Sequence, residues 1–162
     1  MKKPHLIKLA LALLLLGCAG ILFARFLRRD DGVSEKTFFY DLSERKLFAA
    51  AREAIPPIRG INDAGEDAVR AIVIAPGGDE DHEGERKIVY LEKYAPGLKQ
   101  HIEKVRAGQA DPLPTRVQNS MRFVKRVEDA EWHAVNSPEG QQIMTEWQVA
   151  GPDGEFPAVC VP

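Results

Sequence analysis

The stretch AVRAIVIAP (residues 68–76) carries the strongest strand signal in the chain. It is short and rich in β-branched residues, and Pro76, Gly77 and Gly78 end it. Residues 71–75 are all apolar, and a strand that is apolar on both faces is typical of the centre of a sheet. The pattern therefore predicts a central strand with a neighbour on each side.

Two hairpins are predicted, one on each side of this strand along the chain. KTFFYDLSERKLFAA (36–50) has β-prone runs near 37–40 and 46–50, separated by polar residues. MRFVKRVEDAEWHAV (121–135) repeats the arrangement around a polar turn at 128–131. Between the first hairpin and the central strand, AIPPI (54–58) cannot continue a central strand, because its prolines lack N–H donors.

Two helices are also predicted. Apolar residues spaced by three and four indicate one helix face over about five turns, with a kink or break at Pro96 and an end at 107–114. These residues are Ile88, Leu91, Ala95, Leu98, Ile102 and Val105. The second helix has Ser137 as its N-cap and Pro138 at its first position. The tail after it, 151–162, is rich in turn residues, and we expect it to end in an edge strand.

The expected fold class is therefore α+β. A mostly antiparallel sheet, made of two hairpins and the central strand, combines with two helices in a soluble domain over 37–162. A membrane anchor over 1–29 and a polar tether over 30–36 precede this domain.

The N-terminal segment predicts a single-pass membrane helix. Sixteen uncharged residues, 9–24, lie between Lys8 and Arg25, and they span about 24 Å as a helix, short of the roughly 30 Å hydrocarbon core. The flanking basic side chains can snorkel to the interface, which extends the contact with lipid to 6–27.

This segment also carries features of two other kinds of N-terminus. LLGC (15–18) resembles a lipobox, in which Cys18 would be lipidated, and GCA (17–19) resembles the cleavage site of a secretory signal. The apolar run continues through ILFARF (21–26), where a lipoprotein normally becomes polar, and cleavage at GCA would cut the run in its middle. We therefore expect an uncleaved anchor and no lipidation of Cys18.

The charges are distributed unevenly along the chain. The first 29 residues carry six basic and no acidic residues, whereas the rest carries 16 basic and 24 acidic residues, a net charge of −8. Such a domain repels phosphate backbones, so we expect no nucleic-acid partner. A short basic N-terminus before the first apolar segment usually stays on the cytoplasmic side of the membrane. We therefore expect the domain on the outer face of the cytoplasmic membrane.

No catalytic or cofactor motif stands out. The segment GGDEDHEGERK (77–87) matches the first half of an EF-hand loop, but Arg86 and Tyr90 occupy positions that need an apolar residue and a bidentate Glu. We interpret it as a solvated acidic turn, so no metal or cofactor is expected. The residues nearest to a metal site are Asp79, Asp81, His82 and Glu83. The four histidines are scattered, no G-x-S-x-G elbow exists, and the chain is predicted not to be an enzyme.

Five segments in order resemble an uncharacterised family of small single-pass membrane-anchored bacterial proteins of planctomycete type. They are FFYDLSERKLF (38–48), AIPPI (54–58), AVRAIVI (68–74), YLEKYAP (90–96) and SPEGQ (137–141). The resemblance implies a membrane-anchored architecture and carries no chemistry. Some members have a Cys pair after the central strand, where this chain has Pro76, Gly77 and Gly78, so no redox or metal role of such a pair is expected.

The function predicted from these observations is that of a membrane-anchored, non-catalytic envelope protein. Its domain would act as an accessory or protein-interaction module with an unidentified protein partner. Two alternatives stay open. One is a metal-dependent enzyme or metal-binding protein that uses the acidic loop 79–85. The other is a pilin-like subunit, although pilins carry a Glu early in the mature helix and this chain has no acidic residue before Asp30.

Overall fold

The computed structural model describes residues 19, 34–62, 65–75, 86–152 and 154–162. The described residues from Ser34 onward belong to one compact unit. Its sheet has seven strands in antiparallel pairs. The strands are β1 (Lys36–Asp41), β2 (Lys46–Ala51), β3 (Ala68–Ala75), β4 (Lys87–Tyr94), β5 (Arg122–Lys125), β6 (His133–Ala134) and β7 (Ala158–Val159). Three helices complete the domain, which confirms the α+β class.

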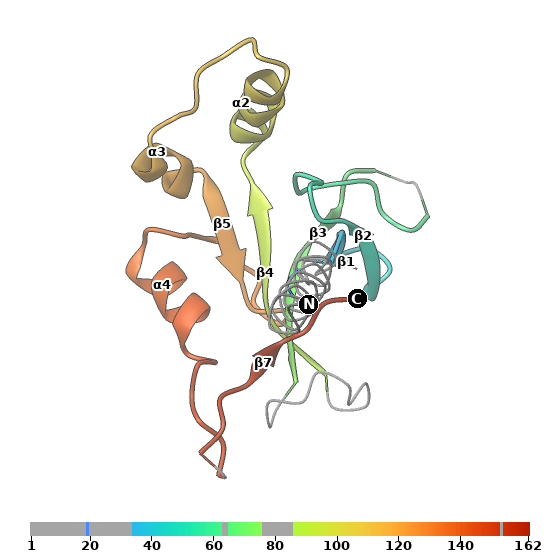
Figure 1. Ribbon diagram of the computed structural model, residues 1–162, viewed down its shortest axis with the longest axis vertical. Helices are drawn as coiled ribbons and strands as arrows, with labels where there is room; N and C mark the ends of the chain where they lie inside the picture. Colours follow the sequence, from blue (N-terminus) through green and yellow to red (C-terminus); the bar gives the residue numbers. More distant parts are fainter. Residues whose placement is uncertain (1–18, 20–33, 63–64, 76–85, 153) are drawn as a thin grey trace, which may run out of the picture. The chain divides into compact units, whose positions relative to one another are not determined.

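Strand β3 lies at the centre of the sheet, as its apolar sequence predicts. The strand order is β2-β1-β3-β4-β5-β6, and β7 also pairs with β3 (Figure 1). β4 pairs with the middle of β3, so β1 and β7 share the other edge, β1 at Ala68 to Arg70 and β7 at Ile74 and Ala75. The tail strand predicted for 151–162 is therefore present as β7.

Both predicted hairpins are present. β1 and β2 pair from Lys36 with Ala51 to Asp41 with Lys46. β5 and β6 pair through Phe123 with Ala134 and Val124 with His133, so the connection of the second hairpin is longer than the predicted turn at 128–131. The AIPPI segment contains no strand, and its Pro56–Pro57 peptide bond is cis.

The helix predicted to begin near Ile88 is wrong in its first half. Residues from Lys87 to Tyr94 form strand β4, and only α2 (Pro96–Arg106) is helical. The register of β4 on β3 explains the misleading spacing: Ala71 pairs with Leu91 and Ile72 with Tyr90, but Val73 pairs with Ile88. Val89 is the extra residue of a β-bulge, and a bulge shifts the alternation of side chains by one. Ile88 and Leu91 therefore both contact the same apolar cluster, with a spacing of three that resembles a helix face.

The other two helices lie against β5. α3 (Thr115–Ser120) was not predicted, and it leads directly into β5 (Figure 1). α4 (Pro138–Thr145) matches the predicted last helix: the Ser137 hydroxyl accepts a hydrogen bond from the Gly140 N–H at 3.0 Å. Gly140 packs so closely that a Cβ atom there would collide with the carbonyl oxygen of Ala134.

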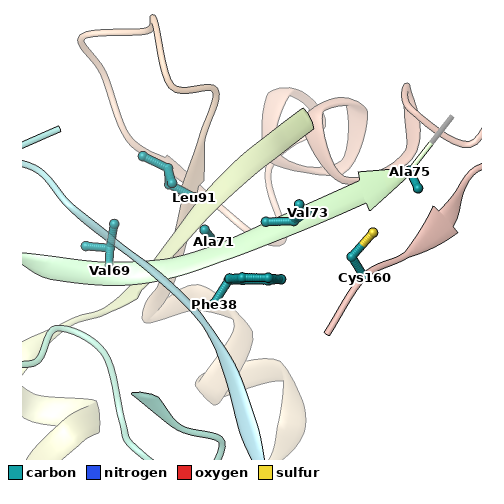
Figure 2. Packing of buried hydrophobic residues seen from close by; sticks show 7 residues of the cluster. All are labelled: Phe38, Val69, Ala71, Val73, Ala75, Leu91 and Cys160. Carbon is teal, nitrogen blue, oxygen red and sulfur yellow. The ribbon is translucent and has the colours of Figure 1, made fainter. Parts of the chain in front are cut away.

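Two apolar clusters fill the domain. The first gathers around β3 and is shown in Figure 2. It consists of Phe38, Val69, Ala71, Val73, Ala75, Leu91 and Cys160. The second joins α4 to the sheet through Val124, Val135 and Ile143. Cys160 is 4% exposed, and its backbone N–H bonds to the Val73 carbonyl at 2.8 Å, so it packs as a small apolar residue of the terminal segment.

Asp41 is a buried carboxylate that organises the turn after β1. It is 0% exposed. Its Oδ1 accepts hydrogen bonds from the Ser43 N–H, the Ser43 hydroxyl and the Glu44 N–H, and its Oδ2 accepts one from the Ile61 N–H at 2.7 Å. The Glu44 N–H contributes most to lowering the pKa of the Asp41 carboxyl, with burial opposing it and the other donors adding to it. Asp41 thus ties the β1–β2 turn to the loop at residue 61.

The predicted membrane anchor, 1–29, lies outside the described residues except for Ala19. Among the residues that the structure describes, no helix has the length and apolar character needed to cross a bilayer.

Replacing Asp41 by Asn should lower the melting temperature at pH 7. The NH2 group of the amide would take the place of one carboxylate oxygen, so a hydrogen-bond donor would face an N–H donor where the wild type has an acceptor. A folded-state pKa that is depressed contributes stability above the unfolded pKa, and this stability is lost as pH falls through the folded pKa. The difference in melting temperature between wild type and Asp41→Asn should therefore shrink in acid. Thermal unfolding of the full chain in detergent, from pH 7 down to pH 3, measures it.

Glu53→Gln, at an exposed carboxylate, is the matched control and should melt like the wild type at every pH. A melting temperature of Asp41→Asn equal to that of wild type at pH 7 would contradict the role given to Asp41.

Candidate functional site

Two lysines come together on the face of the sheet that carries the first apolar cluster. Leu91, a member of that cluster, pairs with Lys125, and Lys93 pairs with Phe123. Side chains alternate along a strand, so Leu91, Lys93 and Lys125 share one face and the two lysines are diagonal neighbours. Lys93 does not stand out in the sequence, because the spacing of the apolar residues around it predicts a helix.

The ring of Trp132 lies against both ammonium groups. The Nζ atoms of Lys93 and Lys125 lie 4.3 Å and 5.4 Å from the ring centroid, within the range of a cation–π contact. Lys125 Nζ also donates to the Asp129 carbonyl at 2.8 Å. The loop between β5 and β6 thus holds the indole and one lysine in a defined arrangement.

The pKa of Lys93 is lowered, first by burial and second by the charge of Lys125. Both causes disfavour a second positive charge at this place. In the described part of the chain, neither lysine has a carboxylate partner that would offset them. The pair is therefore a local excess of positive charge in a domain whose sequence is net acidic.

A groove adjoins Lys125. It has a volume of about 370 Å³. Its lining comes from the end of β1, the β1–β2 turn, β5 and the loop after β5, and consists of Tyr40, Leu42, Arg45, Lys125, Val127 and Glu128. We call this cavity, together with Lys93 and Trp132, the lysine–tryptophan groove. It combines three cations and one carboxylate with aromatic and aliphatic walls.

Arg122 of β5 and Arg126, which directly follows β5, form ion pairs elsewhere. Arg122 bonds through Nε to the buried Glu92 carboxylate at 2.7 Å, and Arg126 bonds through Nε to Glu146 at 2.6 Å. Strand alternation predicts this separation, with Arg122 and Arg126 on one side and Lys125 on the other. The basic residues of 122–126 therefore do not merge into one nucleic-acid face.

The weak metal candidates Asp79, Asp81, His82 and Glu83 lie outside the described residues, as does Cys18. Across 34–62, 65–75, 86–152 and 154–162, no three or more His, Cys, Asp or Glu side chains cluster in a way that could hold a metal ion. His101 contacts the Asp111 carbonyl at 2.9 Å. His133 lies in β6.

The lysine–tryptophan groove suits recognition of an anion. Ammonium groups bind carboxylate or phosphate oxygens as point charges, and the apolar walls offer contact area beside them. The sequence offers a weak signal for Trp132 as a site residue, since it directly follows the charged turn at 128–131. Lys93 could not, because its place opposite β5 depends on strand pairing.

Comparison of the chain with protein-family models, with curated proteins and with solved structures finds no match.

Replacing Lys125 by Met should raise the pKa of Lys93 toward its ordinary value, because one of the two causes of its depression disappears. NMR titration of the lysine side-chain signals in the full chain in micelles measures this pKa. Lys99→Met is the control, because Lys99 pairs with Glu66 at 2.7 Å and should leave Lys93 unaffected. An unchanged Lys93 pKa in Lys125→Met would show that the two ammonium groups do not interact.

Proposed function

We propose that the protein is a membrane-anchored, non-catalytic domain that binds an acidic segment of a protein partner in the lysine–tryptophan groove. The observation that carries the proposal is the pair Lys93 and Lys125, two ammonium groups beside one indole without a carboxylate partner among the described residues. An acidic side chain of a partner would supply the missing countercharge.

A short acidic segment fits this site better than a polyanion does. The groove offers three cations, while the domain as a whole carries a net charge of −8. A nucleic acid would be attracted at the groove and repelled by the rest of the surface. A peptide with one or two carboxylates and an apolar or aromatic residue would meet only the groove, and its apolar side chain would contact Tyr40 or Leu42.

The membrane part of the proposal rests on the sequence. The apolar segment 9–24 with basic residues at both ends supports an uncleaved anchor in contact with lipid through 6–27. The short basic N-terminus supports an extracytoplasmic domain, and the resemblance to membrane-anchored bacterial proteins of planctomycete type agrees with this arrangement. The alternatives of a metal-dependent protein using 79–85 and of a pilin-like subunit stay predictions that no described residue tests.

Binding of an acidic peptide tests the groove. A synthetic peptide rich in Glu with one Phe should bind the full chain in detergent micelles, as measured by calorimetry. The double variant Lys93→Met/Lys125→Met should bind about tenfold more weakly, because two charge pairs at half-buried lysines contribute roughly 1 kcal/mol or slightly more together.

The matched control, Lys36→Met/Lys46→Met, removes two exposed lysines elsewhere and has the same net charge as Lys93→Met/Lys125→Met. If both double variants lost binding equally, the attraction would be a general charge effect and the proposed site would be rejected. A Lys-rich peptide of equal length gains nothing from Lys93 and Lys125, so it should bind the wild type no more tightly than it binds Lys93→Met/Lys125→Met.

Intact-mass analysis of the protein extracted from membranes tests the anchor. We expect an unmodified chain that still contains 1–27, because the apolar run passes through the lipobox-like and signal-like sites without a break. A chain that begins at Cys18 with a diacylglyceryl adduct, or one that begins near Gly20, would reject the anchor while leaving the groove untouched.

A further inference from the structure

Strand β2 is an open edge of the sheet. It is the first strand in the order β2-β1-β3-β4-β5-β6 and has six residues, whereas β6 at the other end has two. Within the described part of the chain, no segment pairs with the outer side of β2. A long free edge is a template for another strand, and natural proteins usually protect such an edge.

The hydrogen bonds of the hairpin show which groups of β2 point outward. The Arg52 N–H bonds to the Glu35 carbonyl at 2.8 Å, in continuation of the pairing of Ala51 with Lys36. Antiparallel pairs alternate between bonded and non-bonded positions, so the even-numbered residues of β2 bond to β1. The odd-numbered residues, Leu47, Ala49 and Ala51, direct their N–H and C=O groups away from the sheet.

The outward strand lacks the usual protection. Between Leu47 and Ala51 there is no charged residue and no proline. Leu47 is 37% exposed, and Ala49 and Ala51 are also exposed. Leu47 and Ala49 each have both a backbone N–H and a backbone C=O available for pairing. The Ala51 carbonyl, by contrast, already accepts a hydrogen bond from the Ala54 N–H at 3.0 Å.

We propose that β2 pairs with β2 of a second copy of this chain, antiparallel and centred on Phe48. In this register Leu47 lies opposite Ala49 of the second copy, and Ala49 opposite its Leu47. Each of these two positions is a bonded pair that exchanges two N–H···O=C bonds. The two Phe48 residues face each other at the twofold axis as a non-bonded pair, and Lys46 lies opposite Ala50.

The neighbouring registers are poorer. Centring on Ala49 would place Lys46 opposite Arg52 of the second copy, and like charges directly opposite each other are destabilising. It would also need the Ala51 carbonyl, which is already bonded. Centring on Leu47 would bring Arg45 into the pairing, but Arg45 has φ 55° in the turn and cannot extend the strand. The sequence of the edge therefore complements itself in one register.

The paired sheets would form one continuous sheet. A twofold axis perpendicular to a sheet keeps the same face up in both copies, so the lysine–tryptophan grooves of the two copies would open on the same side. Such an assembly could hold two acidic segments of one partner, and this consequence alone rests on the proposed function. The edge contact itself is small compared with a stable interface, so we expect a reversible dimer.

Single-cysteine crosslinking tests the register. In a Cys18→Ala/Cys160→Ala background, Phe48→Cys should form a disulfide-linked dimer on mild oxidation of the full chain in lipid bilayers. The Cα atoms of a non-bonded antiparallel pair are about 4.5 Å apart, within disulfide range. Val117→Cys, at an exposed position on α3, is the control. Crosslinking at position 48 should exceed that at 117 several-fold, and equal crosslinking would overturn the proposal.

A second measurement keeps Phe48 in place. A mixture of Leu47→Cys chains and Ala49→Cys chains should give more 47–49 dimer than the 47–47 or 49–49 dimer that each variant gives alone. Position 47 of one copy faces position 49 of the other, and neither position faces itself. Ala49→Pro removes an outward N–H and no bond to β1, so in the Phe48→Cys chain it should abolish crosslinking with little change in melting temperature. An excess of 47–47 or 49–49 dimers, or full crosslinking with Ala49→Pro, would reject the pairing.

Discussion

The pairing of β3 on both of its edges is the constraint on which the rest of the domain depends. β4 covers one edge, while β1 and β7 divide the other. These three contacts bring residues from both ends of the described domain to one strand. They also assemble the first apolar cluster, since Phe38, Leu91 and Cys160 reach it only from strands or segments that flank β3.

The β-bulge at Val89 sets what lies on each face of β4. Before the bulge, Ile88 pairs with Val73 and contacts the apolar cluster. After it, Leu91 pairs with Ala71 and belongs to the same cluster. The alternation that continues beyond Leu91 places Lys93 on this face and leaves Glu92 on the other. The bulge thus decides both that Glu92 meets Arg122 and that Lys93 meets Lys125 and Trp132.

The charges of the domain follow the same division. On one face the buried Glu92 is satisfied by Arg122, while Arg126 bonds to Glu146 and Asp129. On the other face the two lysines share an indole and have only carbonyl and ring contacts among the described residues. A buried carboxylate must be paired or hydrogen-bonded, and Asp41 and Glu92 both are. Lys93 and Lys125 are only half-buried, so they carry no such requirement, and under the proposed function a partner's carboxylates bind them.

The sequence by itself determined the central strand, both hairpins, the last helix with its Ser137 cap and the terminal strand, because each depends on local patterns of apolar, turn and capping residues. It also predicted an anchor over 1–29, which lies outside the described residues except for Ala19. Only the tertiary structure decided that residues 87–94 are a strand, because a bulge mimics helical spacing and strand pairing overrides local periodicity. The lysine–tryptophan groove depends on the same pairing: Lys93 lies 32 positions before Lys125 in the chain, and no local pattern records that two strands bring them together.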